Sequence, residues 1–316
     1  MPPVRYDEVY EVAGDLLSSP PSITVALEGD KGDEWAAAME AELQSLWENE
    51  VYDVVDRPPG KKVIGTKWVL RVKTDSEGNI DKFKARVVAK GFRQMEGVDF
   101  DETFAPTVRF ESVRALIALA ASLGWQLDQM DVTTAFLYAK LEEETYVDIP
   151  EGVAPGGEGK VWRLRKCLYG LKQSPRMWNM TIDKVLKEMG FSRFTTEHGI
   201  YVVGEGDDRV FVALYVDDLL IVWKNNQSKE EVKERLKIHF KMKDLGSAQF
   251  LLGVEIRRRL EGGYFMVQEK YANEVVAKFG IADAKVVSTP FEPGSVLGLE
   301  ESDETALHPD MVDVPY

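Results

Sequence analysis

Two adjacent aspartates, Asp217 and Asp218, separate two apolar runs at residues 211–216 and 219–222. Apolar and β-branched residues on both sides of so short a polar break predict two buried strands joined by a tight turn. Burying an ionised carboxylate without a partner costs several kcal/mol, so two of them at the tip of such a hairpin indicate a divalent cation. A simple Asp-Asp surface turn is the alternative, and it does not explain the apolar flanks.

A third carboxylate, Asp131, lies near the end of another predicted strand at residues 125–132. If the strands are neighbours in one sheet, Asp131 and Asp217 can face each other across a few ångströms, as two-metal phosphoryl transfer requires. Magnesium keeps water and substrate phosphates as ligands, so two or three carboxylates suffice. Asp128 should point to the opposite face of its strand, and we exclude it from the site. With three His and one Cys in the chain, a zinc site is not indicated.

The tetrapeptide at residues 215–218 resembles the catalytic box of reverse transcriptases, and the chain resembles the copia-type retrotransposon branch of that family. Further blocks of the family's pattern occur in family order between about residue 33 and residue 257. They lie at residues 35–39, 65–69, 84–92, 99–108, 129–132, 168–176 and 242–246. The resemblance implies an RNA-directed DNA polymerase, a nucleotidyltransferase that forms part of a Pol polyprotein.

The resemblance also implies where substrates and ions bind. Asp131 and Asp217 are expected to hold two Mg²⁺ ions, with Mn²⁺ as an alternative, and Asp218 is expected to be the third carboxylate. By the resemblance, one ion would lower the pKa of the primer 3′-hydroxyl, and the other would bind the triphosphate and the departing pyrophosphate. The deoxynucleoside triphosphate is expected to contact Lys84, Arg86, Thr134, Ala135, Phe136, Tyr169, Gly170 and Val216. The primer and an RNA or DNA template are expected to contact Lys67, Lys90, Lys172, Arg176, Leu252 and Gly253.

Two of these expectations leave alternatives open. By resemblance, the Phe136 ring clashes with a ribose 2′-hydroxyl and so selects deoxynucleotides. An ordinary core phenylalanine is the alternative, because buried Phe is common. Either Lys84 or Arg86 could contact the triphosphate, and the sequence does not distinguish them.

The predicted elements place these residues on a sheet and on a basic hairpin. Residues 64–73 and 83–89 predict a hairpin whose second strand alternates an apolar and a basic face. The apolar face comprises Phe83, Ala85, Val87 and Ala89, and the basic face comprises Lys82, Lys84, Arg86 and Lys90. Three further strands are predicted at residues 199–203, 209–216 and 219–223.

Helices are predicted between these strands. One begins at an Asp33 cap and covers residues 34–49, another follows a Ser112 cap, and a third begins at Ser174 with proline at its first turn. A fourth is predicted from a capping box at residues 228–231. The expected core face of the first helix is Trp35, Met39, Leu43, Leu46 and Trp47.

This element order predicts an α+β fold: a right-hand polymerase with a ferredoxin-like antiparallel palm sheet, helices on one face of it, and β-rich fingers. We divide the chain into an acidic, loosely ordered segment (1–32), the reverse transcriptase fingers and palm (33–257), the start of a thumb or connection (258–290) and an acidic flexible segment (291–316).

The net charge of −15 does not exclude nucleic acid, because the charge is unevenly distributed. Residues 1–56 carry a net −12 and residues 291–316 a net −7, which leaves +4 for residues 57–290. Residues 61–93 hold ten Lys or Arg against three acids, and residues 163–176 hold five against none. Local basic patches set the affinity for phosphate backbones. Solvated charged faces are the alternative.

No targeting feature is evident. No apolar run approaches 18 residues, the N-terminus lacks the pattern of a signal peptide, and a single cysteine, Cys167, fits a reducing compartment. We therefore expect no membrane partner and a location in cytoplasmic virus-like particles and in the nucleus. RNase H and integrase domains are expected in a longer polyprotein.

Two rival functions remain open. One is a catalytically inactive nucleic-acid-binding fragment of a decayed or truncated element, because the family continues into a full thumb that grips the duplex. The other is a magnesium-dependent phosphohydrolase, which lacks an obvious water-positioning residue and does not explain the basic hairpin.

Overall fold

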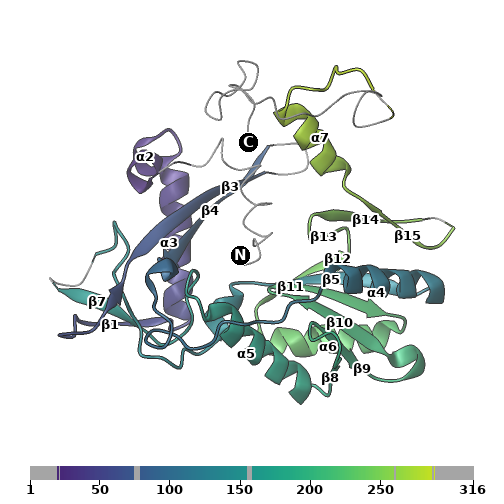
Figure 1. Cartoon of the computed structure of the whole chain (residues 1–316), viewed down its shortest axis with the longest axis horizontal. Helices are drawn as coiled ribbons and strands as arrows, with labels where there is room; N and C mark the ends of the chain where they lie inside the picture. The colour runs from purple at the N-terminus through teal and green to yellow at the C-terminus, as the bar shows by residue number, and fades with distance from the viewer. Residues whose placement is uncertain are drawn as a thin grey trace, which may run out of the picture.

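A six-stranded antiparallel sheet is the largest sheet of the described structure (Figure 1), and the three aspartates lie on two of its neighbouring strands and at the turn beside them. The computed structural model describes residues 20, 22–74, 79–154, 159–259, 261–286 and 288. The strand order is β12-β5-β11-β10-β9-β8. Their bounds are β5 Gln126–Val132, β8 Ser192–Arg193, β9 Ile200–Val203, β10 Val210–Tyr215, β11 Asp218–Trp223 and β12 Met242–Ser247. The predicted strands around the aspartates are confirmed.

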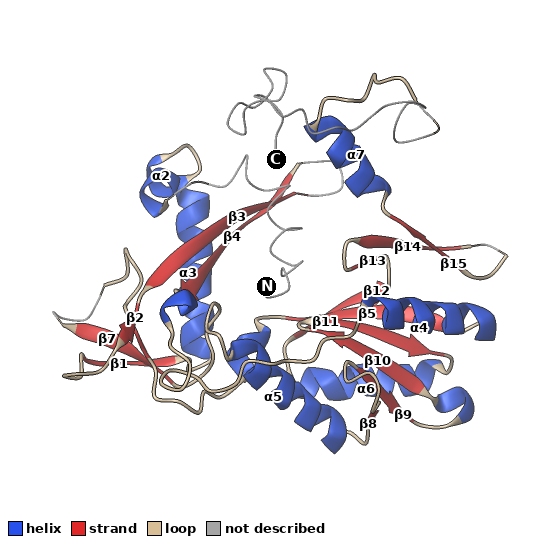
Figure 2. Cartoon of the chain, in the orientation of Figure 1, coloured by secondary structure: helices blue, strands red, loops and turns tan. Residues whose placement is uncertain are grey.

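Helices cover both faces of this sheet (Figure 2). Helices α5 (Ser174–Glu188) and α6 (Asn226–His239) pack on the face that presents Met130 and Ile221, whereas α4 (Phe110–Leu123) packs on the opposite face. The expectation of helices on one face is therefore wrong for α4. The reason is that β10 and β11 are apolar at nearly every position, so both of their faces must be buried.

A long two-stranded hairpin rises beside the sheet and packs on two helices (Figure 1). It consists of β3 (Thr66–Thr74) and β4 (Ile80–Ala89), and its helices are α2 (Ile23–Glu28) and α3 (Gly32–Glu48). Ala85, Val87 and Ala89 are buried, as the alternation predicts. Trp35, Met39 and Leu46 of α3 are buried as well.

Two expectations about α3 are wrong. Trp47 is 68% exposed, because it lies about 100° around the helix from the buried Leu46. The helix begins at Gly32, one residue before Asp33, and no side chain caps it.

The starts of α4 and α6 also differ from the prediction. Arg109 occupies the N-cap of α4, and the Ser112 hydroxyl instead donates to Glu197. Helix α6 is capped by Asn225, which accepts from the Gln227 N–H, and the Ser228 hydroxyl donates to Asp208. At α6 a neighbouring side chain takes the cap, because several side chains near a helix start can serve it, whereas no side chain caps α4.

Smaller elements surround the sheet and the hairpin. One sheet has the order β1-β7-β6-β2, and another has the order β13-β14-β15 and leads into helix α7. Their bounds are β1 Tyr52–Asp56, β2 Val63–Ile64, β6 Tyr146–Val147, β7 Lys160–Leu164, β13 Phe250–Leu251, β14 Val254–Arg258, β15 Tyr264–Val267 and α7 Glu269–Lys278. Three short 3₁₀ helices are η1 Gly91–Arg93, η2 Ala135–Tyr138 and η3 Gly206–Asp208.

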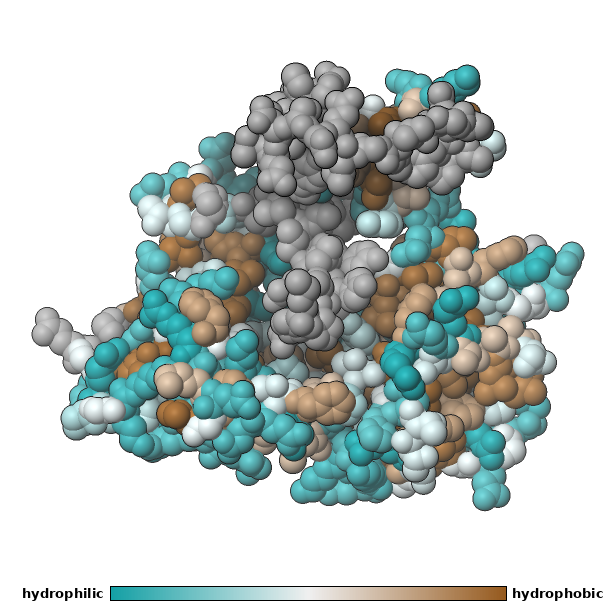
Figure 3. All heavy atoms as spheres, viewed as in Figure 1, coloured by the Kyte–Doolittle hydropathy of each residue, from teal (hydrophilic) through white to brown (hydrophobic). Residues whose placement is uncertain are grey.

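The described surface mixes hydrophilic and hydrophobic side chains on the face seen in Figure 3, in keeping with a chain that is 29% charged. Within residues 1–32, helix α2 buries Ile23 and Ala26, so the expected loose order is wrong there. Residues 291–316 lie outside the described residues. Across the parts of the chain that the structure describes, no helix is both long and apolar enough to cross a membrane.

Candidate active site

The two adjacent aspartates lie at a two-residue turn between β10 and β11. Tyr215 pairs with Asp218, so Val216 and Asp217 form the turn itself. Val216 has a φ of +54°, which β-branched residues rarely adopt and which costs about 1–3 kcal/mol. A positive φ at the first turn residue matches the twist of the flanking strands. The surrounding contacts must therefore hold the strained residue in place.

Asp131 is brought to this turn by the pairing of β5 with β11. Asp131 lies directly opposite Asp218, and the Val132 N–H donates to the Asp217 carbonyl over 2.8 Å. The predicted neighbouring of the two strands is confirmed, but the residue opposite Asp131 is Asp218, and Asp217 lies in the adjoining turn rather than on the neighbouring strand. All three aspartates are half-buried.

The carboxylates influence one another. Burial raises the pKa of Asp217, and the charge of Asp131 raises it further. Burial also raises the pKa of Asp218, to about 6, and the charges of Asp217 and Asp131 add to the effect. The Gln129 amide donates to Asp218 Oδ1 over 3.1 Å and opposes the shift. A bound cation would offset the repulsion among these carboxylates and stabilise their charged forms.

The donor set suits Mg²⁺ in its chemistry, because all three side chains offer hard carboxylate oxygens and an excess of negative charge. Within the described ranges, no three His, Cys, Asp or Glu side chains already converge closely enough to hold an ion. Magnesium is commonly held by one or two carboxylates together with water and substrate phosphates. The described side chains therefore do not form a complete ligand cage, and an ion held here would need water or substrate phosphates as further ligands.

Basic side chains of β4 face this acidic group. Burial lowers the pKa of Lys84 to about 8, and Arg86 and Lys73 lower it further, while Asp217 and Asp131 act in the opposite direction. Lys84 is thus close enough to Asp217 and Asp131 for their charges to affect its pKa. The Arg86 guanidinium carbon lies 4.4 Å from the centre of the Tyr169 ring.

Phe136 and Tyr169 lie next to each other, with ring centroids 4.9 Å apart. Phe136 is half-buried in η2, after the buried Ala135 and after Thr134, whose φ is +56°. The Tyr169 hydroxyl is buried and has no hydrogen-bond partner among the described residues, and burial raises its pKa to about 12. These aromatic residues, with Arg86, form one group beside β4.

Gly170 lets the chain after Tyr169 pass close to the end of β4. Its φ is +88°, and a Cβ there would lie 2.2 Å from the Ala89 carbonyl oxygen. The Ala89 N–H donates to the Tyr169 carbonyl over 2.8 Å. Any larger residue at position 170 would clash with the β4 backbone, so the close approach of the two segments requires glycine.

The residues expected to contact primer and template are spread over the molecule. Lys67 is exposed on β3, and Lys90 follows β4, while Lys172 precedes α5. Arg176 is already in an ion pair with Glu102 at 2.7 Å. Leu252 and Gly253 form the two-residue turn between β13 and β14, both with positive φ. These six residues therefore lie on several different elements.

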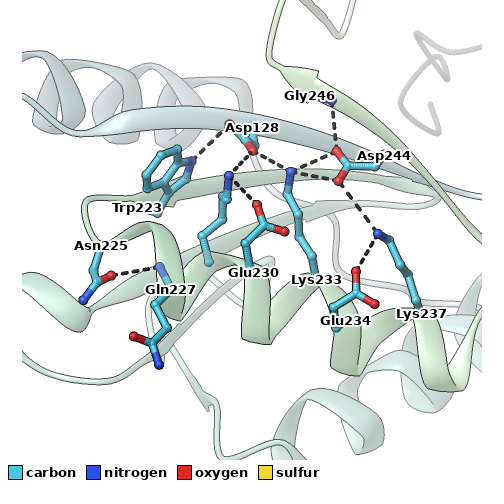
Figure 4. A network of polar contacts seen from close by, with 11 residues as sticks. Asp128, Trp223, Asn225, Gln227, Glu230, Lys233, Glu234, Lys237, Asp244 and Gly246 are labelled. Carbon is cyan, nitrogen blue, oxygen red and sulfur yellow. Dashed lines mark hydrogen bonds and ion pairs between the residues drawn. The ribbon is translucent and has the colours of Figure 1, made fainter.

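Asp128 faces away from the site, as predicted. Its carboxylate lies under α6, where it accepts hydrogen bonds from the Lys233 ammonium and the Trp223 indole (Figure 4). Lys233 also binds Asp244 of β12 at 2.9 Å. Burial alone would lower the pKa of Lys233, but these hydrogen bonds outweigh it and raise the pKa. The group ties β5, α6 and β12 together behind the aspartates.

Two residues near the carboxylates were not expected. Gln129 binds Asp218, and its position two residues before Asp131 on the same strand face could have identified it. The second residue is Trp178, whose indole N–H donates to the Val216 carbonyl over 2.7 Å. Nothing in the local sequence of α5 indicates this contact.

Comparisons with known proteins agree with this geometry. The family model of reverse transcriptase (RNA-dependent DNA polymerase) matches residues 49–293. The chain is 39% identical over 289 residues to the retrovirus-related Pol polyprotein from transposon TNT 1-94 of Nicotiana tabacum, covering 90% of this chain and 22% of that protein. It is 32% identical over 298 residues to the Pol polyprotein from transposon RE1 of Arabidopsis thaliana, covering 94% of this chain and 20% of that protein. The chain thus spans about a fifth of the length of these relatives.

Proposed function

Because the chain belongs to the reverse transcriptase (RNA-dependent DNA polymerase) family, we propose that it adds deoxynucleotides to a primer 3′-hydroxyl on an RNA or DNA template. One observation carries the proposal most strongly. Asp131 is paired with Asp218 on the neighbouring strand, and Lys84 of β4 is near enough to Asp131 and Asp217 for their charges to raise its pKa. An acidic group facing a basic one is suited to a triphosphate held between metal ions and cations.

Asp131 and Asp217 would hold two Mg²⁺ ions, or Mn²⁺ in their place, with Asp218 as the third carboxylate. When bound, such ions lower the pKa of a hydroxyl and neutralise charge on phosphates. The protein contributes the placement of these carboxylates through strand pairing and a hydrogen-bonded turn. A rigid sheet suits this task, because the site must keep its geometry to within about 0.5 Å.

Lys84 and Arg86 would neutralise the triphosphate. With a pKa of about 8, Lys84 is mostly protonated at neutral pH, and an approaching polyphosphate favours the charged form further. Arg86 is stacked on Tyr169, which limits the directions in which it can extend. Thr134, Ala135, Gly170 and Val216 complete the proposed nucleotide pocket.

In this proposal the six-stranded sheet is the palm, the β3–β4 hairpin with its helices belongs to the fingers, and residues 258–290 begin the thumb or connection. Leu252 and Gly253, at the turn between β13 and β14, would steady the primer. Lys67, Lys90, Lys172 and Arg176 would contact primer or template phosphates. As part of a longer polyprotein, the chain would work with RNase H and integrase domains, in cytoplasmic particles or the nucleus.

Primer extension tests the function directly. We expect the protein to incorporate dTTP on poly(rA)–oligo(dT) in the presence of Mg²⁺, and to do so only with both primer and template. Absence of incorporation together with salt-sensitive duplex binding would favour the inactive nucleic-acid-binding fragment. Hydrolysis of dTTP without primer would favour the phosphohydrolase.

Replacing Phe136 tests the proposed selection of deoxynucleotides. Phe136→Val removes the ring that would exclude a ribose 2′-hydroxyl. We expect kcat/KM for ribonucleotides, relative to deoxynucleotides, to rise roughly 10- to 100-fold. Single-nucleotide incorporation of UTP and dTTP on the same primer–template measures this ratio. Phe279→Val, at a partly exposed position after α7, serves as the control and should leave the ratio unchanged. An unchanged ratio in Phe136→Val would mean that Phe136 is only a packing residue.

A further inference from the structure

The strained turn that carries Asp217 accepts a hydrogen bond from the indole of Trp178. Trp178 is 1% exposed in α5, and its N–H donates to the Val216 carbonyl over 2.7 Å. Val216 is the residue with the φ of +54°. The hydrogen bond therefore reaches the turn at its most strained residue, and on the face of the sheet covered by α5 and α6.

Trp178 is itself fixed by an aromatic cluster formed with Tyr138 and Phe240. The Trp178 and Phe240 rings meet edge to face with centroids 5.2 Å apart, and the Tyr138 and Phe240 rings do the same at 5.2 Å. Trp178 and Tyr138 lie 6.4 Å apart. Such packing leaves the indole little freedom to turn its N–H away.

The same cluster holds a second segment next to the site. The Tyr138 hydroxyl accepts from the Lys241 N–H over 2.7 Å, and the Lys241 carbonyl accepts from the Thr133 N–H over 2.9 Å. Thr133 lies two residues after Asp131. The cluster thus contacts the Val216 backbone directly and is linked to the Thr133 backbone through Lys241.

The orientation of Asp217 follows from the peptide groups on either side of it. The Val216 carbonyl belongs to the peptide plane that enters Asp217, and Trp178 fixes that plane. The Asp217 carbonyl belongs to the plane that leaves it, and the Val132 N–H fixes that one. Because both planes are held, the direction of the Asp217 side chain from its Cα is held as well.

We propose that Trp178 is a positioning residue that sets the geometry of the Asp217 carboxylate through the Val216 carbonyl. This inference rests on the proposed polymerase activity for its kinetic consequence, but not for its structural one. Trp178 touches no reacting group. If it acted only by filling space, removing its N–H while retaining its ring shape would have no effect.

Hydrogen exchange tests the structural consequence without any need for activity. In Trp178→Phe, we expect the Val132 amide, which binds the Asp217 carbonyl, to exchange at least about tenfold faster than in the parent. Amides in the middle of β10 should be unchanged. Trp162→Phe is the matched control, because Trp162 is equally buried at 1% exposure but stacks on Tyr52 in a different sheet. It should leave Val132 exchange as in the parent.

Primer extension tests the kinetic consequence. A displacement of about 1 Å in a reacting group can cost roughly 100-fold, so we expect kcat in Trp178→Phe to fall about 10- to 100-fold. KM for dTTP and the Kd for primer–template should stay within about twofold, since Trp178 is 1% exposed and out of reach of either ligand. Replacing Trp178 by benzothienylalanine, which keeps the bicyclic ring and lacks the N–H, separates the hydrogen bond from the volume and serves if the phenylalanine variant does not fold.

The outcomes are distinguishable. Faster exchange of the Val132 amide in the benzothienylalanine protein supports the inference. If kcat also falls while KM and Kd stay unchanged, the positioning role of Trp178 extends to catalysis. Unchanged exchange overturns the inference, as does a loss of activity that appears only in KM or Kd. If the parent protein does not extend primers, the proposed function fails, and the exchange result still decides whether Trp178 positions the turn.

Discussion

Asp217→Asn is expected to lower magnesium-dependent primer extension at least about 10³-fold, while the folded structure is retained. Asparagine has nearly the same shape as aspartate, but it is neutral and is a far weaker ligand for Mg²⁺. The turn itself should persist, because the hydrogen bonds to the Val216 and Asp217 carbonyls involve backbone oxygens. Asp217 also lies beside two other half-buried carboxylates, so removing its charge relieves repulsion.

The variant should therefore unfold at the same urea concentration as the parent, or at a higher one, when no divalent ion is present. Asp283→Asn is the matched control, because it makes the same chemical change at an exposed position outside the site. Primer extension and urea denaturation of all three proteins measure the two effects separately. Retained extension by Asp217→Asn would falsify the assignment of Asp217 as a metal ligand. A loss of extension accompanied by unfolding would leave a structural role as the explanation.

Lys233→Met is expected to reduce the free energy of unfolding by about 3–5 kcal/mol. The Lys233 side chain is 3% exposed, and its ammonium binds Asp128 on β5 and Asp244 on β12. Methionine retains much of the aliphatic volume but leaves the Asp128 carboxylate, which is 9% exposed, with only the neutral Trp223 indole at 3.1 Å and the more distant Lys229 ammonium at 3.4 Å. A buried charge that loses its main partner makes a large unfavourable contribution.

Urea denaturation of Lys233→Met beside Lys31→Met measures this effect. Lys31 pairs with Glu34 at the surface, and such pairs contribute about 0–1 kcal/mol. The double variant Lys233→Met with Asp128→Asn should be less destabilised than the sum of the single variants, since no unpaired charge remains at Asp128. A loss below about 1 kcal/mol in Lys233→Met would show that Lys229 or water replaces Lys233 as the partner.

The local elements around the site could be predicted because their signals are local. Apolar runs on both sides of Asp217 and Asp218 predicted a buried hairpin, and alternation along residues 83–89 predicted one apolar and one basic face; the structure confirms both. The exclusion of Asp128 was also correct, because side chains in a strand alternate between faces whatever the rest of the chain does. The family resemblance added the roles of these residues, which periodicity cannot supply.

Helix caps and the helix on the second face of the sheet were predicted wrongly for a different reason. Asn225, Ser228 and their neighbours all have side chains able to cap α6, and only the folded arrangement around Asp208 decides among them. Helix α4 has an apolar face of the kind expected, but periodicity does not say which side of a sheet that face covers. Both questions depend on residues far away along the chain.

The sequence by itself determined which residues could form the acidic group and which strands carry them, because residue type and alternation are properties of short segments. Only the tertiary structure decided that Asp131 pairs with Asp218, that Lys233 is buried between two carboxylates, and that Trp178 binds the strained turn at Val216. These contacts join residues that lie between 11 and 105 positions apart. Strand register and side-chain burial arise from the packing of whole layers, so short-range patterns cannot specify them.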